Sequence, residues 1–424
     1  MASERVILSS LAVLALAAAA FVQTGRGAGE TTVEAAGGHG GAAFVRANGT
    51  RFTLGGRPFY SNGFNAYWLM YMASDPAADR SKAAAALEEA ARLGATLVRT
   101  WAFGDGGYRA LQVSPGVYNE EVFRGLDYVI AEAKKRGVHL ILSLVNNWEG
   151  YGGKKQYVQW ARDQGHSLNS DDDFFTNSVT KGFYKNHVKA VLTRVNKLTG
   201  VAYKDDPTIF AWELMNEPRC QSDLSGRTLQ AWITEMAGYA KSLDPNHMLE
   251  IGLEGFYGES TPDRKRQFNP RAYAVGTDFI SNNLIPGIDF ATIHSYPDQW
   301  VPGASNDEQV EFMRRWMASH AGDAAAALRK PLLVAEFGWS ARSSGGVRAV
   351  APVRDAYFGM VYDAIYASAR AGGPLAGGLF WQVMEAGMES WTDGYDVVLG
   401  RSPSTAAVVA RECARITSLN QVSS

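Results

Sequence analysis

Two glutamates in this chain stand where an apolar run of residues stops abruptly. Glu217 follows the run 208–215 beside Asn216 and precedes a proline, and Glu336 closes the run 331–335. A carboxylate at such a place is costly to bury unless it is paired or used. Two carboxylates in one cleft could hydrolyse a glycosidic bond, since one can donate a proton while the other attacks carbon or activates water.

Other side chains that could do chemistry follow comparable apolar runs. Arg99 and Trp101 close one such run, His294 and Tyr296 another, and Trp381 a third. Each of them alone is more often a structural residue, such as a core histidine with satisfied hydrogen bonds. An arginine, a histidine, a tyrosine and two glutamates in one cleft would shift one another's pKa values. Such a cluster favours catalysis. Glu254 is the main rival carboxylate, and it could form a structural pair or contact the substrate.

The elements that must position these residues alternate between strand-like and helix-like segments. Short apolar segments predict eight strands, and amphipathic segments that end at Gly or before Pro predict the helices between them. The strands are expected at 59–65, 95–103, 138–144, 208–218, 247–255, 289–296, 331–337 and 377–384. The helices are expected at 81–93, 120–136, 174–198, 224–243, 307–320, 352–371 and 405–416.

This alternation predicts an α/β fold, a (β/α)8 TIM barrel with enlarged loops at the C-terminal face. In such a barrel catalytic groups stand at the C-terminal ends of the strands, where the residues above are found. Residues 44–60 predict a small N-terminal β-hairpin that plugs the lower end, and 256–287 an irregular insertion. A doubly wound sheet that binds a dinucleotide is disfavoured, because no Gly-x-Gly-x-x-Gly follows the first strand.

The N-terminus reads as a targeting segment. Arg5 precedes an apolar run at 6–22 and then small residues, which predicts a signal peptide over about residues 1–28. A membrane anchor is the alternative, but the run is short for a span. Residues 29–43 are Gly/Ala-rich and are expected to be disordered, which leaves 44–420 as the catalytic barrel. The protein is expected to be secreted and free of the membrane after cleavage.

Secretion gives meaning to two further features. The tripeptide Asn48-Gly-Thr is an acceptor sequence for N-glycosylation. Cys220 and Cys413 could form a disulfide or remain free, and the sequence leaves both alternatives open. The net charge of −2 gives no general attraction to nucleic acid. Seven scattered histidines without ligand spacing predict no metal, and we expect no cofactor.

Five motifs give the chain a resemblance to a known family. They are Arg99-Thr-Trp101, Asn216-Glu-Pro218, His294-Ser-Tyr-Pro-Asp298, Glu336-Phe-Gly-Trp339 and Phe380-Trp381. Together they resemble glycoside hydrolase family 5, and within it the secreted plant-type endo-β-1,4-mannanases. The resemblance covers nearly all of the chain from residue 44 onwards.

The resemblance implies a role for each matched residue. Glu217 would be the acid/base, and Glu336 the nucleophile of a retaining double displacement on internal β-1,4-mannosidic bonds. Asn216 would contact the sugar 2-hydroxyl. Arg99 and Tyr296 would hydrogen-bond the nucleophile, and His294 would stand near the acid/base. Trp381 would form a platform at the cleaved bond, and Trp101 would be another aromatic that contacts mannan.

The charges expected near the two glutamates predict which of them is ionised and which is protonated. Arg99 is expected to keep Glu336 ionised, while Glu217, with less positive charge near it, is expected to keep its proton. Two alternatives stay open. The first is an endo-hydrolase or transglycosylase that acts on another β-1,4-glycan, and the second is an inactive barrel that only binds carbohydrate.

Overall fold

The core of the structure is a barrel of eight parallel strands. The computed structural model describes residues 43–75 and 79–421. The sheet order is β10-β9-β8-β5-β4-β13-β12-β11, so each strand lies beside its neighbours in the chain. The strands are β4 (Gly63–Asn65), β5 (Leu97–Trp101), β8 (His139–Ser143), β9 (Ile209–Glu213), β10 (Met248–Glu250), β11 (Ala291–Ser295), β12 (Leu332–Phe337) and β13 (Leu375–Phe380).

Two backbone hydrogen bonds close this sheet on itself. Asp289 N–H donates to the Leu249 carbonyl over 2.8 Å, and His294 N–H donates to the Glu254 carbonyl over 2.9 Å. They join the chain around β10 to the chain around β11, which are the two ends of the sheet order. The predicted (β/α)8 barrel is therefore confirmed.

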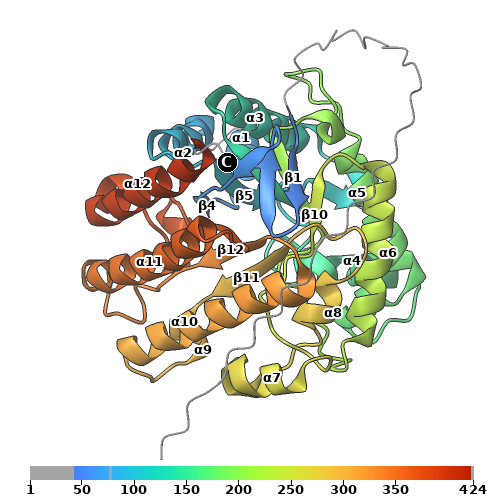
Figure 1. Ribbon diagram of the computed structural model, residues 1–424. Helices are drawn as coiled ribbons and strands as arrows, with labels where there is room; N and C mark the ends of the chain where they lie inside the picture. The colour runs from blue at the N-terminus through green and yellow to red at the C-terminus, as the bar shows by residue number, and fades with distance from the viewer. Residues whose placement is uncertain (1–42, 76–78, 422–424) are drawn as a thin grey trace, which may run out of the picture. The chain divides into compact units, whose positions relative to one another are not determined.

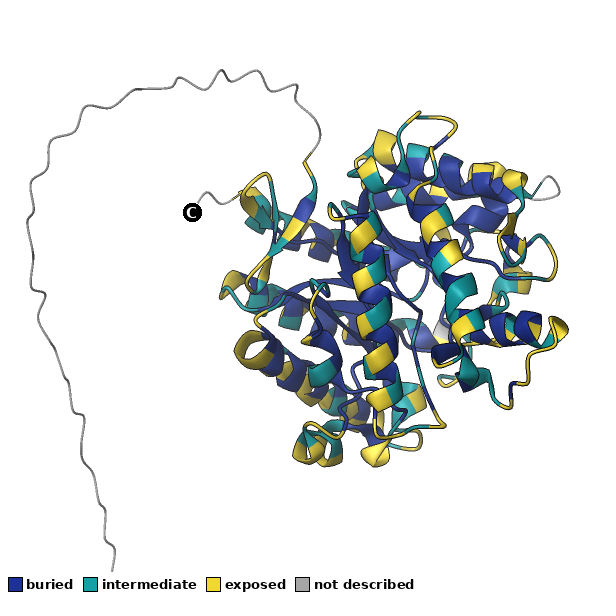
Figure 2. Ribbon diagram, turned by 90° about the vertical axis from the view of Figure 1, so that its right-hand side faces the viewer, coloured by how far each residue is buried: buried dark blue, intermediate teal, exposed yellow. Residues whose placement is uncertain are grey.

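Helices surround the barrel, as Figure 1 shows. Their inward faces are buried and their outward faces exposed (Figure 2), as expected of amphipathic helices on a sheet. They are α1 (Leu69–Ser74), α2 (Arg80–Arg92), α3 (Glu120–Arg136), α4 (Gly153–Asp163), α5 (Ser178–Leu192), α6 (Arg227–Leu243), α7 (Pro262–Phe268), α8 (Phe279–Asn283), α9 (Pro297–Trp300), α10 (Asn306–Asp323), α11 (Val347–Arg370) and α12 (Pro403–Thr417).

A three-stranded antiparallel sheet near the N-terminus covers the lower end of the barrel. It consists of β1 (Val45–Asn48), β2 (Arg51–Leu54) and β3 (Arg57–Phe59). The Phe52 ring lies 5.0 Å from that of Phe210 on β9, and 5.1 Å from that of Phe290, which directly precedes β11. These edge-on aromatic contacts fill the bottom of the barrel. A second small ribbon, β6 (Gln112–Ser114) with β7 (Val117–Tyr118), follows β5.

Several element boundaries differ from the predicted ones. The first predicted strand, 59–65, is divided: Phe59 belongs to β3, and the barrel strand begins at Gly63. A side chain at Gly63 would place its Cβ 1.7 Å from the Leu97 carbonyl oxygen, so only glycine permits this pairing. The fourth strand ends at Glu213, four residues before Glu217. The insertion at 256–287 contains the short helices α7 and α8, and α4 was not predicted at all.

The two cysteines are both buried and both free. Cys220 lies in the loop after β9, where its Sγ is 3.4 Å from Ser222 Oγ, and Cys413 lies in α12. The disulfide that the sequence left open is absent. The predicted signal peptide and the segment 29–43 fall almost wholly outside the described residues. Among the described helices, none is both long and apolar enough to cross a membrane.

Candidate active site

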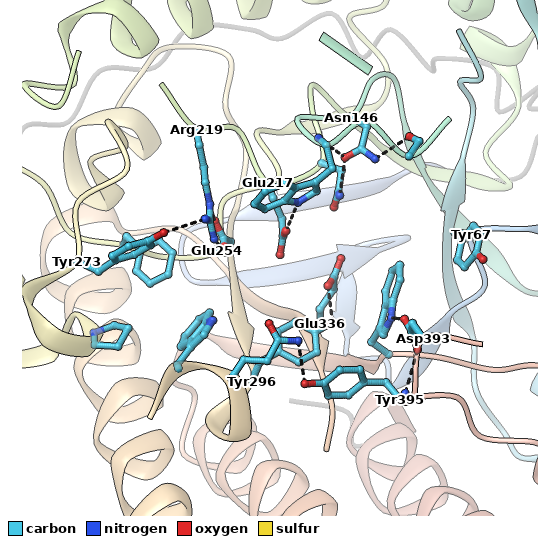
Figure 3. A pocket seen from close by; sticks show the side chains of 18 of the residues that line it. Tyr67, Asn146, Glu217, Arg219, Glu254, Tyr273, Tyr296, Glu336, Asp393 and Tyr395 are labelled. Carbon is cyan, nitrogen blue, oxygen red and sulfur yellow. Dashed lines mark hydrogen bonds and ion pairs between the residues drawn. The ribbon is translucent and has the colours of Figure 1, made fainter. Parts of the chain in front are cut away.

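An open cleft of about 860 Å³ lies over the C-terminal ends of the barrel strands. Figure 3 shows Glu217 and Glu336 reaching toward each other from opposite walls of this cleft. A carboxylate oxygen of each, together with a ring nitrogen of His294, lies within 4.8 Å of the others. Retaining glycosidases place their two carboxyl groups about 5–5.5 Å apart, and inverting ones about 6.5–9.5 Å apart. The closest approach of the two carboxylates is therefore shorter than the inverting range and favours the retaining geometry.

Glu336, the fifth residue of β12, is held from two sides. Arg99 donates from Nη1 to Oε1, and the Tyr296 hydroxyl donates to Oε2, both over 2.6 Å. Only 4% of Glu336 is exposed. Burial raises the pKa of Glu336, and the charges of His294 and Arg99 lower it without reversing that shift. Both carboxylate oxygens are thus fixed in direction, as an attacking nucleophile requires.

All five N–H groups of Arg99 have acceptors. Besides Glu336, the guanidinium donates to both carboxylate oxygens of Glu213, over 2.6 and 2.8 Å. It also donates to the side-chain oxygens of Asn65, over 3.0 Å, and Asn216, over 2.6 Å. Arg99 is fully buried, so these bonds are not screened by water. Lysine could not satisfy this set, because its ammonium has only three donors.

Glu217 stands on the loop that continues β9. Its φ of 51° is in the left-handed region, which is uncommon outside glycine, and its N–H is held by the Gly252 carbonyl over 3.0 Å. Its two oxygens accept hydrogen bonds from the Trp148 indole N–H and from His294 Nδ1, each over 2.6 Å. Such strain concentrates at functional sites, where the surrounding structure holds it in place.

The charges and hydrogen bonds around Glu217 differ from those that the sequence predicted. Burial would raise the pKa of Glu217, but the His294 hydrogen bond and charge, with Arg219, lower it to about 2. Burial opposes a charge on His294, yet the Glu336 charge and the hydrogen bond to Glu217 raise the pKa of the imidazole. The prediction that Glu217 keeps its proton because less positive charge lies near it is therefore wrong. The pKa directions of the two groups favour the proton of this hydrogen-bonded pair on His294.

The remaining predicted residues line the same cleft or support it. Asn216 accepts from Arg99 and donates from Nδ2 to Asn146 Oδ1 over 3.0 Å, which leaves one amide N–H for the cleft. Trp101 and Trp381 lie with ring centroids 6.0 Å apart. Trp381 stacks on Tyr67, with 11° between the ring planes. These aromatic and amide side chains all line the cleft.

Sequence reasoning missed two polar supports of the cleft. Arg219 forms a two-pronged ion pair with Glu254, over 2.6 and 2.8 Å, and its guanidinium carbon lies 4.7 Å from the centroid of the Trp148 ring. Asp393 accepts from the Trp381 indole over 2.6 Å. A basic residue directly after Asn-Glu-Pro was a usable signal for Arg219, whereas nothing local marked Asp393.

Some of the other tryptophans also lie in the cleft. Trp148 and Trp300 line the cleft, while Trp160, Trp339 and Trp391 do not. Burial and the charge of Glu217 raise the pKa of Glu254 to about 7, although Arg219 opposes this. Glu254 is the carboxyl group of the cleft wall that pairs with Arg219.

Glu217, His294 and Glu336 are also the group, among the described residues, whose oxygen and nitrogen atoms could converge on a metal ion. The predicted independence from metals stays a prediction. A barrel whose cleft holds two carboxylates at this spacing, one flanked by arginine and tyrosine and one by histidine, belongs to the class of retaining glycosidases.

Comparison with known proteins gives the family. A model described as GH family 5 beta-mannosidase-like matches residues 42–397. The chain therefore belongs to glycoside hydrolase family 5. A protein of Oryza sativa subsp. japonica is 73% identical over 420 residues, which is 98% of each chain. Mannan endo-1,4-beta-mannosidase 7 of Arabidopsis thaliana is 55% identical, over 89% of this chain and 86% of its own.

A solved structure agrees with these relatives. The endo-1,4-beta-mannanase of Rhizomucor miehei superposes with a TM-score of 0.72 at 32% sequence identity, and the match covers 88% of this chain and all of the other. The predicted family resemblance is confirmed.

Proposed function

We propose that this protein is an endo-β-1,4-mannanase in which Glu336 is the nucleophile and Glu217 the acid/base. The observation that carries the assignment is the convergence of these two carboxylates within 4.8 Å inside an open cleft. Because the cleft is open to solvent, a polymer can lie in it and be cut internally. The aromatic side chains on its walls suit the apolar faces of sugar rings.

In the first step, a Glu336 oxygen attacks the anomeric carbon as the bond from that carbon to the leaving oxygen breaks. The leaving oxygen needs a proton, which Glu217 transfers. Glu217 receives that proton from His294 Nδ1, 2.6 Å away, and passes it on, so the step ends with an ionised Glu217 and a neutral His294. As negative charge develops on the leaving oxygen, the proton therefore moves from the imidazole side of this pair toward the sugar.

In the second step, water replaces the leaving sugar. Glu217 accepts a proton from this water, the water oxygen bonds to the anomeric carbon, and the bond to Glu336 breaks. The negative charge returns to Glu336, where Arg99 and Tyr296 receive it. Two displacements give a product of the original anomeric configuration.

The walls of the cleft supply the substrate contacts. Trp381 and Trp101 would support the sugar at the cleaved bond, and the free Asn216 amide N–H would bind its 2-hydroxyl. Trp148 and Trp300, on the far side of Glu217, would carry sugars beyond that bond. Mannans, galactomannans and glucomannans are the proposed substrates.

The site of action in this proposal is extracellular, at the cell wall. Cleavage near residue 28 would release the barrel, with residues 29–43 as a leader to it. Asn48 is exposed at the turn between β1 and β2, on the end of the barrel away from the cleft. A glycan there would therefore leave the cleft open to a polymer.

Reducing-sugar release from galactomannan, glucomannan and cellulose tests the function. We expect cleavage of the first two, and loss of that activity in Glu336→Gln at unchanged melting temperature. Activity on cellulose alone, or polysaccharide binding without any cleavage, would reject the mannanase proposal. Proton NMR of the first product would reject the double displacement if the anomeric configuration is inverted.

A further inference from the structure

Two carboxyl groups that the mechanism does not use lie beneath the reacting pair. Glu213 on β9 and Glu250 on β10 are direct neighbours in the parallel register, so their side chains leave the sheet on the same face. Both are completely buried. Each carboxyl group therefore lies within hydrogen-bonding reach of the other.

A hydrogen bond between two carboxyl groups requires a proton, because an ionised carboxylate only accepts. Both oxygens of Glu213 are occupied by N–H groups of Arg99. Glu250 Oε2 accepts from the Gly252 N–H and the Thr292 hydroxyl, whereas Oε1 receives no hydrogen bond from any described residue. The shared proton therefore belongs on Glu250 Oε1, and it points to Glu213.

The charges around this pair lead to the same assignment. The floor of the cleft holds four carboxyl groups, one guanidinium and one imidazole, all of them on or beside neighbouring strands. These groups are Arg99, Glu213, Glu217, Glu250, His294 and Glu336. If all four carboxyl groups were ionised, the floor would carry two excess negative charges even with the imidazole protonated. Burial of unpaired charge is strongly unfavourable, so a proton on one carboxyl group is favoured.

The pKa directions agree with this geometry. Burial and the charge of Glu213 raise the pKa of Glu250 well above its usual range. Burial acts to raise that of Glu213 as well, but Arg99 lowers it overall. The neighbours from the other packed elements are uncharged: Ser143 on β8, Thr292 on β11, and the Tyr184 phenol of α5, whose pKa burial raises.

We propose that Glu250 is a carboxylic acid that donates its proton to Glu213, and that this pair positions Arg99 and, through it, the nucleophile. Ionisation of Glu250 would place a second negative charge beside Glu213 and draw Arg99 away from Glu336. The alkaline limit of nucleophilic attack would then be set by Glu250, a residue that touches neither substrate nor reacting atom. This inference rests on the proposed role of Glu336.

Infrared spectroscopy tests the proton directly. The difference spectrum between the wild type and Glu250→Gln at pH 7 should contain the C=O stretch of a protonated carboxyl group. The control variant Glu235→Gln, which breaks only a partly exposed pair with Lys181 and Lys185, should give no such band. If the band is absent from the Glu250→Gln difference spectrum, the proposal is overturned. This readout does not depend on which glutamate is the nucleophile.

Kinetics test the positioning role. A dinitrophenyl β-mannobioside has a leaving group that needs no proton, so the acid/base does not limit its cleavage and the rate reports attack by Glu336. Glu250→Gln keeps a neutral donor to Glu213, and we expect a fall in kcat of about threefold at pH 6, against about 100-fold for Glu250→Ala, which leaves a buried acceptor unpaired. The alkaline decline of the wild type should be absent in Glu250→Gln.

An unchanged alkaline decline in Glu250→Gln would overturn the proposal, as would a loss of activity as large as that of Glu250→Ala. A folded Glu336→Gln variant that still cleaves the dinitrophenyl substrate would instead overturn the nucleophile assignment. In that case the infrared band would still report the proton on Glu250, so the two failures are distinguishable.

Discussion

Removal of the Tyr296 hydroxyl should move the acid limb of the pH–rate profile upward. This hydroxyl donates to Glu336 Oε2 over 2.6 Å and stabilises only the ionised carboxylate. A hydrogen bond to a charged group contributes about 1.5–3 kcal/mol, and 1.36 kcal/mol corresponds to one pKa unit. Both partners are more than nine-tenths buried, so solvent does not replace the lost bond. The pKa of Glu336 should therefore rise by about 1–2 units in Tyr296→Phe.

The assay is kcat/KM on mannohexaose as a function of pH, which reports the ionisations of the free enzyme. The acid limb falls as the nucleophile is protonated, so a higher pKa shifts that limb to higher pH by the same amount, about 1–2 units. Tyr357→Phe is the matched control, because the Tyr357 hydroxyl bonds Ser295 and does not reach Glu336. If Tyr296→Phe and the wild type share one acid limb, the reasoning about Glu336 is refuted.

Three further predictions concern the acid/base and the scaffold. Glu217→Ala should lower kcat on mannan by about 10²–10⁴-fold, and azide should restore turnover of the dinitrophenyl β-mannobioside, whose leaving group needs no proton, with a β-glycosyl azide as product; an α-azide would contradict retention. Trp148→Phe removes a donor to the ionised Glu217 and makes this carboxylate more basic, so the pair with His294 holds its proton more tightly. The alkaline limb on mannan reports loss of that proton and should move up by about 0.5 unit, a small shift because Trp148 is 43% exposed; a downward shift would contradict this. Asp127→Asn breaks a buried two-pronged pair with Arg194 and should lower the free energy of unfolding, measured with urea, by about 3–5 kcal/mol. The control Asp263→Asn, at an exposed side chain, should change this free energy by less than about 0.5 kcal/mol. Equal losses in the two variants would contradict the role of the Asp127–Arg194 pair.

The barrel could be predicted because its strands are buried on both faces. An apolar run such as 331–335 has no polar alternation, and a helix-forming segment that ends at a glycine, such as 120–136, marks the crossover that follows a parallel strand. The helix α4 escaped prediction because it begins at two consecutive glycines without a side-chain cap. The three residues of β10 are too few for periodicity to define their ends.

The residues of the candidate site could be predicted from the sequence, but their protonation states could not. Glu217, Glu336 and the side chains that donate hydrogen bonds to Glu336 could be predicted because they lie at strand ends, and the end of a strand is a local property of the sequence. The proton on His294 depends on a 2.6 Å contact between residues 77 positions apart, which no local pattern contains. Glu213 was overlooked for a related reason: inside an apolar strand it reads as an isolated exception until Arg99 is seen beside it.

The N–H groups of Arg99 are all bonded only when the barrel is complete, so catalytic activity indicates that folding is complete. The acceptors of this one side chain come from β4, β9, the loop after β9 and β12, and the farthest lies 237 residues along the chain. A chain that has formed only the first five strands would lack Glu336 and leave an N–H group of the buried Arg99 without its acceptor. During refolding, enzymatic activity should therefore return only with the last strands, in a single step with the burial of Arg99. A partly folded barrel would be inactive rather than weakly active.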